Sequence, residues 1–186
     1  MTQWRPTFGE PIADRAGAAA ALRLPSASVA GTALPVQIVS CGVPYLFVPL
    51  ATRRAVDNAA LDADAYDALR RGAGLDELPV FLFTPEPGRD HTDRATVYSR
   101  MFGPGIGIPE DAATGGASGA LGCYLVRNKV VTPEKAGAML SLQGVKMGRP
   151  SHVHIAIGVD PADQGEIATV RVGGESVVAG EGTLNV

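Results

Sequence analysis

Residues 103–126 read GPGIGIPEDAATGGASGALGCYLV, a glycine-rich loop followed by a stretch that is small and apolar on every side. A helix that is apolar all round is typically buried, because it has no polar face to turn toward water. Each of its glycines weakens helix propensity by about 1 kcal/mol relative to alanine, and close packing has to offset that loss. The stretch therefore predicts a buried helix over residues 117–126, enclosed by a curled sheet.

The start of this helix, at Thr114, Gly115 and Gly116, is a candidate binding site. A helix N-terminus offers unpaired N–H groups and about half a positive charge, and glycine lets a ligand approach the backbone closely. These properties favour an anion, most simply a carboxylate. Asp111 precedes these donors, where an ionised carboxylate is stabilised and is a better hydrogen-bond acceptor than a base. A second interpretation stays open, because Asp or Thr before a helix is often only a cap.

The rest of the chain alternates short strands with short helices. Helices are predicted over residues 14–24, with Asp14 as the cap, and over residues 52–72. The spacing of the strands indicates a largely antiparallel sheet and an α+β fold. We expect residues 1–186 to form one domain, with residues 1–25 as a linker and short helix leading in. Strands are predicted over residues 36–40, 45–50, 80–83, 95–102, 138–143, 152–157, 167–172, 176–179 and 183–186.

The composition excludes several classes of protein. Hydrophobic residues make up 46% and charged residues 19% of the 186 residues, so the chain is not disordered. The formal net charge of −3 excludes a strongly basic nucleic-acid binder. No apolar stretch reaches the roughly 18 residues that a membrane span needs, and the first residues lack a signal peptide's apolar core. We therefore expect a cytoplasmic protein, with Cys41 and Cys123 as small apolar residues of a reducing compartment.

Three histidines and one arginine are further candidates for a functional site. His152 and His154 are two apart on a predicted strand, so both face one side. That spacing fits a metal site or a solvated sheet face, and the solvated face is favoured because no glutamate follows closely. His91 lies in a polar surface loop. Arg149, in a predicted turn, fits either an acidic ligand group or a backbone carbonyl or surface carboxylate.

Two motifs resemble signatures of the PhzF-like family, the phenazine-biosynthesis isomerases. Residues 110–117 read EDAATGGA, where that family has E-D-P-A-T-G-S-A, and residues 143–151 read QGVKMGRPS, like its Q-G-x-x-M-G-R-P-S. Matches at residues 35–44, 172–174 and 182–184 extend the resemblance over nearly the whole chain. The resemblance implies a fold like diaminopimelate epimerase, in which two domains each wrap an antiparallel sheet around a central helix. This chain would then be a single half, the second domain.

The resemblance also implies a reaction. In that family a proton is transferred without cofactor or metal, and the glutamate base lies on the first domain. Asp111 matches the helper acid, and the backbone at Thr114, Gly115, Gly116 and Ala117 would hold the substrate carboxylate. We therefore expect an isomerase or epimerase that acts on a small carboxylate. Its expected partner is a separate first-domain chain or a homo-oligomer, and neither nucleic acid nor membrane is expected to bind.

Two residues depart from the family pattern. Gly116 replaces the family's serine and loses a hydroxyl, and Ala112 replaces its proline and loosens the loop. The loss of the hydroxyl and of the glutamate base supports an alternative function. In that alternative the chain is a non-catalytic module, derived from the same fold, that binds a small acid or dimerises.

Overall fold

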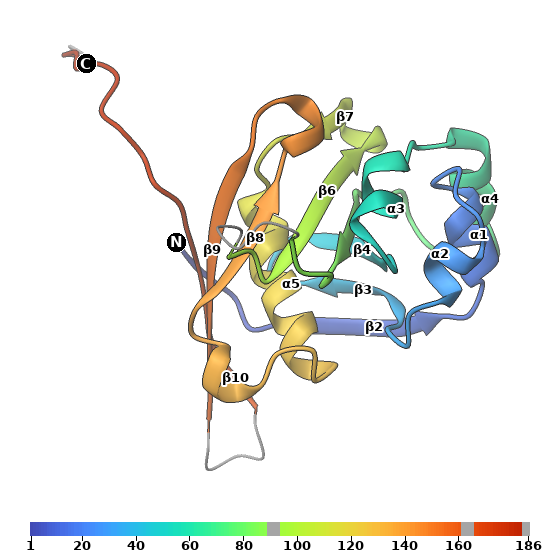
Figure 1. Cartoon of the computed structure of the whole chain (residues 1–186), viewed down its shortest axis with the longest axis horizontal. Coiled ribbons are helices and arrows are strands. Elements are labelled where there is room, and N and C mark those ends of the chain that lie inside the picture. The colour runs from blue at the N-terminus through green and yellow to red at the C-terminus, as the bar shows by residue number, and fades with distance from the viewer. Residues whose placement is uncertain (89–93, 161–165, 184–186) are drawn as a thin grey trace.

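A curled sheet of ten strands organises the described parts of the chain, residues 1–88, 94–160 and 166–183, in a computed structural model (Figure 1). The strand order is β1-β10-β9-β8-β6-β5-β4-β3-β2, and β7 pairs with β6 outside this path. The strands are β1 (Thr2–Gln3), β2 (Thr7–Ile12), β3 (Val36–Ser40), β4 (Pro44–Pro49), β5 (Val80–Thr84), β6 (Val97–Gly103), β7 (Ile108–Asp111), β8 (Met139–Gln143), β9 (Ser151–Val159) and β10 (Ile167–Gly173).

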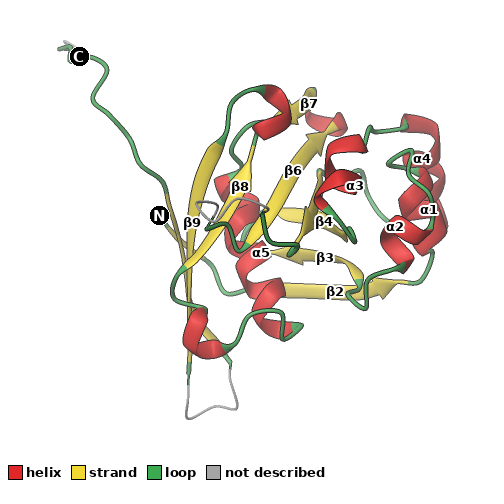
Figure 2. Cartoon of the chain, viewed as in Figure 1, coloured by secondary structure: helices red, strands yellow, loops and turns green. Residues whose placement is uncertain are grey.

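Helices cover both faces of this sheet (Figure 2). One face carries α1 (Arg15–Ala20), α2 (Ala27–Ala30), α3 (Arg53–Asn58) and α4 (Ala63–Gly72), and the other carries α5 (Gly115–Arg127). Short 3-10 turns occupy Pro104–Ile106, Pro133–Lys135 and Val145–Met147. The predicted α+β class is therefore confirmed. None of the helices in the described parts of the chain is long and apolar enough to cross a membrane.

The sheet is mixed rather than purely antiparallel. Most neighbouring strands are antiparallel, as predicted, but β4 pairs with β5 and β6 pairs with β8 in parallel. Parallel neighbours need a crossover connection. In this chain α3 and α4 form the crossover from β4 to β5, and β7 and α5 lie in the one from β6 to β8.

The strands that read as almost entirely apolar are those covered on both faces. In β4, Phe47 faces the core that contains α5, whereas Leu46 and Val48 face the core that contains α1 to α4. Phe47 stacks on Tyr124 of α5 with ring centroids 5.9 Å apart, and Phe83 meets Tyr124 edge-on at 5.3 Å. Double coverage removes the polar face that an antiparallel strand shows to water.

Helix α5 is buried on every side from Ala117 to Leu125 and packs against β3, β4, β9 and β10 (Figure 1). Its glycines allow this close approach. A β-carbon added at Gly122 would lie 2.5 Å from Ile155 Cγ2, and one added at Gly119 would lie 2.7 Å from Val170 Cγ1. The close contacts between helix and sheet thus offset the free energy that the glycines cost the helix.

The single helix predicted over residues 52–72 is wrong, because the chain forms two helices there. Thr52 and Asp62 each cap a helix, accepting hydrogen bonds from the backbone N–H of Ala55 and Ala65. Between the helices the chain is extended, with ψ of 137° at Ala59. A distant side chain, Arg100, binds the carbonyl oxygens at the end of α3, which a local pattern cannot show.

Other boundaries also differ from the prediction. Asp14 caps α1, accepting from the N–H of Gly17 at 2.7 Å, but α1 ends at Ala20 instead of residue 24, and α2 was not predicted. Residues 108–111, predicted as a loop, form β7. The strand predicted over residues 176–179 is absent, because the chain from Gly174 to Gly182 extends away from the body without a pairing strand (Figure 1). Most of the strand predicted over residues 183–186 lies outside the described residues.

Candidate functional site

A buried amide, Gln143, holds the loop between β7 and α5. Its Oε1 accepts the backbone N–H of Thr114 at 3.1 Å, and its Nε2 donates to Thr114 Oγ1 at 2.9 Å and to the carbonyl of Asp111 at 2.8 Å. Gln143 is 0% exposed, and its two bonds to Thr114 are buried, while the bond to Asp111 is partly buried. The last residue of β8 therefore fixes the residues that precede α5.

Asp111 and Thr114 are bonded to one another within this loop. Thr114 Oγ1 donates to Asp111 Oδ2 at 2.8 Å, and the N–H of Ala113 donates to Asp111 Oδ1 at 3.4 Å. Asp111 is half-buried, so its carboxylate is positioned by the protein but still reaches solvent. The structure thus brings together two of the residues that the sequence predicts for the site.

The first turn of α5 presents its backbone N–H groups without a protein acceptor. Thr114 is the N-cap residue, but its side chain makes no capping bond, because its hydroxyl is committed to Asp111 and Gln143. Within the described chain no group accepts the N–H groups of Gly115, Gly116 or Ala117. Gly115 and Gly116 are half-buried. The arrangement offers unpaired donors and a positive helix end to an anion.

Tyr45 is a site residue that the sequence did not reveal. Its hydroxyl lies beside Gly116, such that a β-carbon added at Gly116 would be 3.0 Å from Tyr45 Oη. Burial, and next the negative charge of Asp111, raises the pKa of Tyr45 above its ordinary value. The hydroxyl therefore stays protonated at neutral pH and can donate a hydrogen bond.

Glu110 has a structural role although it is next to Asp111. Arg100 binds it through Nε to Oε1 and Nη2 to Oε2, both at 2.8 Å. Arg100 is 7% exposed and also donates to the carbonyls of Val56 and Ala59. Two parallel bonds to a buried guanidinium fix the orientation of this carboxylate and occupy both of its oxygens. The ion pair instead anchors β7, and with it Asp111, beside the end of α3.

Buried hydroxyls continue the polar network into the core. Ser118 Oγ donates to the carbonyl of Thr114 at 2.8 Å, and Ser99 and Ser141 share a hydrogen bond of 2.9 Å on neighbouring strands. On β8, the side chains of Ser141 and Gln143 are both buried. Buried polar groups of this kind are stable only when satisfied, and these are.

The other candidates lie elsewhere. His152 and His154 are both exposed on one face of β9, as the alternation along the strand predicts. Arg149 is exposed, and its N–H donates to the carbonyl of Gly144. In the described residues no three His, Cys, Asp or Glu side chains are grouped so that they could hold a metal ion. His91 lies outside the described residues.

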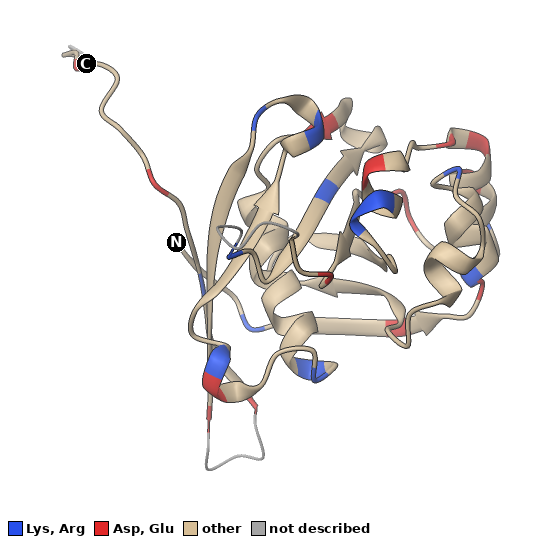
Figure 3. Cartoon of the chain, in the orientation of Figure 1, with Lys and Arg blue, Asp and Glu red and all other residues tan. Residues whose placement is uncertain are grey.

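Charge is dispersed over the fold (Figure 3). Basic and acidic residues are interspersed. Within α5 only Arg127, the last residue, is charged, and the buried part of the helix from Ala117 to Leu125 carries no charge. Asp111 is therefore the ionisable side chain nearest in sequence to the unpaired N–H groups.

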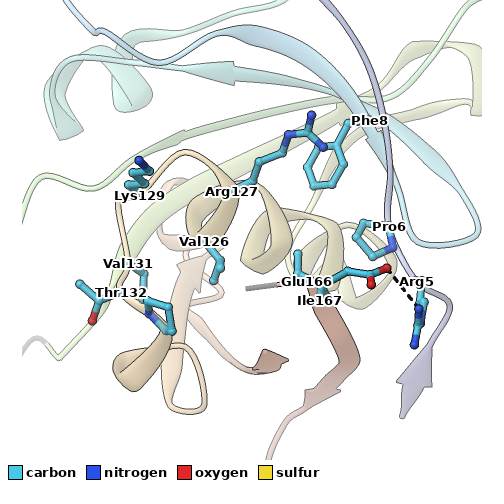
Figure 4. A pocket seen from close by; sticks show the side chains of 11 residues that line it. Arg5, Pro6, Phe8, Val126, Arg127, Lys129, Val131, Thr132, Glu166 and Ile167 are labelled. Atoms are coloured by element: carbon cyan, nitrogen blue, oxygen red, sulfur yellow. Dashed lines mark hydrogen bonds and ion pairs between the residues drawn. The ribbon is translucent and has the colours of Figure 1, made fainter. Parts of the chain in front are cut away.

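A pocket of about 690 Å³ lies at the opposite end of α5 (Figure 4). Arg127 lies 4.2 Å above the ring of Phe8, and Arg5 forms an ion pair with Glu166 at 3.2 Å. Because α5 has 13 residues and rises about 1.5 Å per residue, this pocket is separate from the predicted site. The predicted site lies at the other end of the helix, at the half-buried Gly115 and Gly116.

Comparison with known proteins identifies similar chains. The family model PhzC-PhzF, described as phenazine biosynthesis-like protein, matches residues 1–182. The uncharacterized isomerase YddE of Escherichia coli K12 is 30% identical over 164 residues, covering 86% of this chain and 52% of that relative. The trans-2,3-dihydro-3-hydroxyanthranilate isomerase of Pseudomonas chlororaphis is 32% identical over 161 residues, covering 87% and 51%.

Solved structures show the same architecture. A predicted epimerase from Pseudomonas aeruginosa has a TM-score of 0.67 and 28% identity, covering 94% of this chain and 54% of its own. A Bacillus anthracis phenazine biosynthesis protein of the PhzF family has a TM-score of 0.72 at 18% identity, covering 95% and 60%, and shows the fold alone. The chain spans about half the length of the curated relatives it matches.

Proposed function

The chain belongs to the PhzC-PhzF family of phenazine biosynthesis-like proteins, and from that premise we propose that it forms one half of an isomerase site. In this proposal the start of α5 binds the carboxylate of a small substrate. A first-domain partner supplies the glutamate base. The reaction is a proton transfer that needs neither metal nor cofactor, and the two unpaired cysteines favour the reducing cytoplasm as its location.

One observation carries the proposal. The N–H groups of Gly115, Gly116 and Ala117 have no acceptor within the described chain, whereas the loop before them is fixed by Gln143. A loop that served only to cap the helix would direct the Thr114 or Asp111 side chain to these N–H groups. Here both side chains bond to one another instead, which leaves the donors for a ligand.

The chemistry follows from this geometry. A carboxylate held by fixed backbone donors is oriented in advance, and orientation supplies a large part of the rate in a proton transfer. In this proposal Asp111 lies beside the substrate and takes the part of the helper acid that the family resemblance implies, since its half-buried carboxylate is within reach of a ligand. The protonated hydroxyl of Tyr45 provides the hydrogen-bond donor that the family's serine would provide at position 116.

The partner is proposed on two grounds. Glu110, the glutamate of the motif, is held by Arg100 through two hydrogen bonds, so in this proposal the base is the first-domain glutamate that the family resemblance implies. The chain also exposes apolar side chains that a partner could cover: Trp4 at 77%, Val177 at 89% and Val178 at 84% exposure. Exposed large apolar residues of this kind mark interaction surfaces when they gather on one side.

Complementation tests the proposal. The chain is mixed with the separately produced first half of the Pseudomonas chlororaphis isomerase, and conversion of trans-2,3-dihydro-3-hydroxyanthranilate is followed. We expect activity above that of either part alone, lost with Asp111→Asn and kept with Asp76→Asn, an exposed aspartate outside the site. If the two parts form a complex on size exclusion and show no gain in activity, the proposal is wrong.

A binding or dimerising module is the second candidate, and the glutamate held by Arg100 favours it. Without a base, the unpaired N–H groups at Gly115 and Gly116 would still bind a carboxylate. The exposed Trp4 and Val177 could then meet a second copy of the chain. Sedimentation of the lone chain separates the candidates, because a stable dimer that binds carboxylates and gains no activity from the first-domain partner supports the module.

A further inference from the structure

Two buried thiols from distant parts of the chain lie side by side. Cys41 follows β3 directly and Cys123 lies within α5, yet their sulfur atoms are 3.8 Å apart. Both cysteines are free. This pairing joins the helix that carries the candidate site to the sheet, and the candidate site makes no use of it.

The two sulfur atoms are nearly in van der Waals contact. A disulfide has its sulfur atoms about 2.05 Å apart, so these sulfurs have to approach by less than about 2 Å. Cys41 is outside the hydrogen-bonded ladder of β3 and begins an exposed turn, in which Gly42 has a φ of 129°. We expect movement at the start of this turn, outside the strand ladder, to bring the sulfurs together.

The two thiols differ in pKa and in exposure. The hydrogen bond from the Cys123 thiol lowers the pKa of Cys41, against the opposing effect of burial. The same hydrogen bond, followed by burial, raises the pKa of Cys123 well above its ordinary value. Cys41 is also the more exposed of the two, at 7% against 0%. Cys41, the more exposed sulfur and the one whose pKa is lowered, is therefore the sulfur that an oxidant reaches first, and Cys123 is the thiol beside it.

We propose that Cys41 and Cys123 form a redox modification site, which closes to a reversible disulfide when the chain meets a peroxide. The Cys41 thiolate attacks one peroxide oxygen, the O–O bond breaks, and Cys41 becomes a sulfenic acid as hydroxide leaves and is protonated to water. The Cys123 sulfur then attacks the Cys41 sulfur, the S–O bond breaks, and the hydroxyl leaves with the Cys123 proton as a second water. Two thiols are oxidised by two electrons and one peroxide is reduced to two waters.

The bond would link α5, whose first turn forms the candidate site, to the turn that leads from β3 into β4 and Tyr45. Cys41 is four residues before Tyr45, and Cys123 is seven residues after Gly116 on the same helix. Oxidation would therefore fix the distance between β3 and α5 and, through them, the contact between the Tyr45 hydroxyl and Gly116. The disulfide itself depends only on the positions of the two sulfurs and stands apart from the proposed function.

Intact-mass measurement and thiol counting on the folded full chain test this proposal. After hydrogen peroxide we expect a monomer that has lost the mass of two hydrogen atoms and carries no alkylatable thiol after unfolding. A non-reducing digest should join the peptides of Cys41 and Cys123. Dithiothreitol should restore both thiols, and the thermal midpoint should rise by several degrees in the oxidised form, because the bond closes a long loop.

Single variants assign the order of the steps. In Cys123→Ser the sulfenic acid of Cys41 has no thiol to meet, so dimedone should label Cys41. In Cys41→Ser the remaining Cys123 should stay unlabelled while the chain is folded. Circular dichroism confirms that each variant folds, and the wild-type result stands even where a variant does not. Two thiols still alkylatable after peroxide treatment, a disulfide between chains, or sulfinic acid at Cys41 with Cys123 free would each overturn the proposal.

Discussion

The hydroxyl of Tyr45 occupies the space beside Gly116 that a side chain at position 116 would need. A β-carbon there would stand 3.0 Å from Tyr45 Oη, closer than ordinary van der Waals contact. Gly116 and Tyr45 therefore pack as a pair, in which the absence of a side chain at position 116 leaves room for the tyrosine hydroxyl. In the family pattern a serine fills this position, whereas here the hydroxyl beside the helix is that of Tyr45 on β4.

This pairing predicts a non-additive double-mutant cycle. Gly116→Ser should destabilise the chain by about 1–3 kcal/mol, because it overpacks a closed contact. Tyr45→Phe removes the hydroxyl and should recover part of that loss in the double variant, a coupling of about 1 kcal/mol between neighbouring sites. Urea unfolding of the four proteins measures both quantities. Additive effects would show that the two residues do not touch.

Gln143 should be essential to the loop before α5. Gln143→Leu leaves the N–H of Thr114 and the hydroxyl of Thr114 without their buried partner, and an unsatisfied buried group costs about 1–3 kcal/mol. We expect a loss of stability in that range, with amide chemical-shift changes centred on residues 111–116. Ser141→Ala, two residues away on β8, is the matched control and should leave those amides unchanged. Equal changes in both variants would contradict the role assigned to Gln143.

Two glycines in helices should respond in opposite ways to alanine. Gly122→Ala gains helix propensity but drives a methyl group into Ile155, so a net loss of about 1–3 kcal/mol is expected. Gly72→Ala, at the exposed end of α4 with no neighbouring atom within 4 Å, should instead stabilise by about 0.5–1 kcal/mol. Thermal unfolding of the two variants compares them. A stabilised Gly122→Ala would mean that α5 is not packed closely against β9.

The tyrosines predict how stability depends on alkaline pH. Burial, the largest cause at each position, raises the pKa of all four: Tyr45, Tyr66, Tyr98 and Tyr124. A pKa raised in the folded state contributes stability below the unfolded value of about 10, and this stability is lost as the pH rises through the folded value. Tyrosinate absorbance should stay low at pH 10 in the folded chain and appear together with unfolding. If the folded chain forms tyrosinate with the same titration midpoint as the chain unfolded in guanidinium chloride, the burial of these side chains is contradicted.

Much of this architecture could be predicted from local pattern. The run around residues 117–126 has no polar face, and it lies buried in the structure from Ala117 to Leu125. Asp14 and the apolar strands were also evident, because a cap and an alternation are encoded by neighbours in sequence. The break in the helix predicted over residues 52–72 was hidden, since Arg100 binds the end of α3 from another strand.

The site itself was predictable only in part. Asp111 and Thr114 stand within one short motif, and the structure bonds them together. Tyr45 and Gln143 reach the same loop from β4 and β8, and only the three-dimensional pairing shows their contribution. At Val177 and Val178 the sequence predicts an element that the structure does not contain. Their apolar pattern resembles a strand, but nothing within the described chain pairs with them.

The binding of a carboxylate by the unpaired N–H groups of α5 is the central claim, and an amide titration tests it most directly. Anthranilate is added to the isotope-labelled chain, and the backbone shifts are followed by nuclear magnetic resonance. We predict that Gly115, Gly116 and Ala117 shift first and saturate together, and that benzamide, which has the same ring without the charge, moves none of them. Shifts confined to the pocket around Phe8 and Arg127, or no shift at all, would contradict the account.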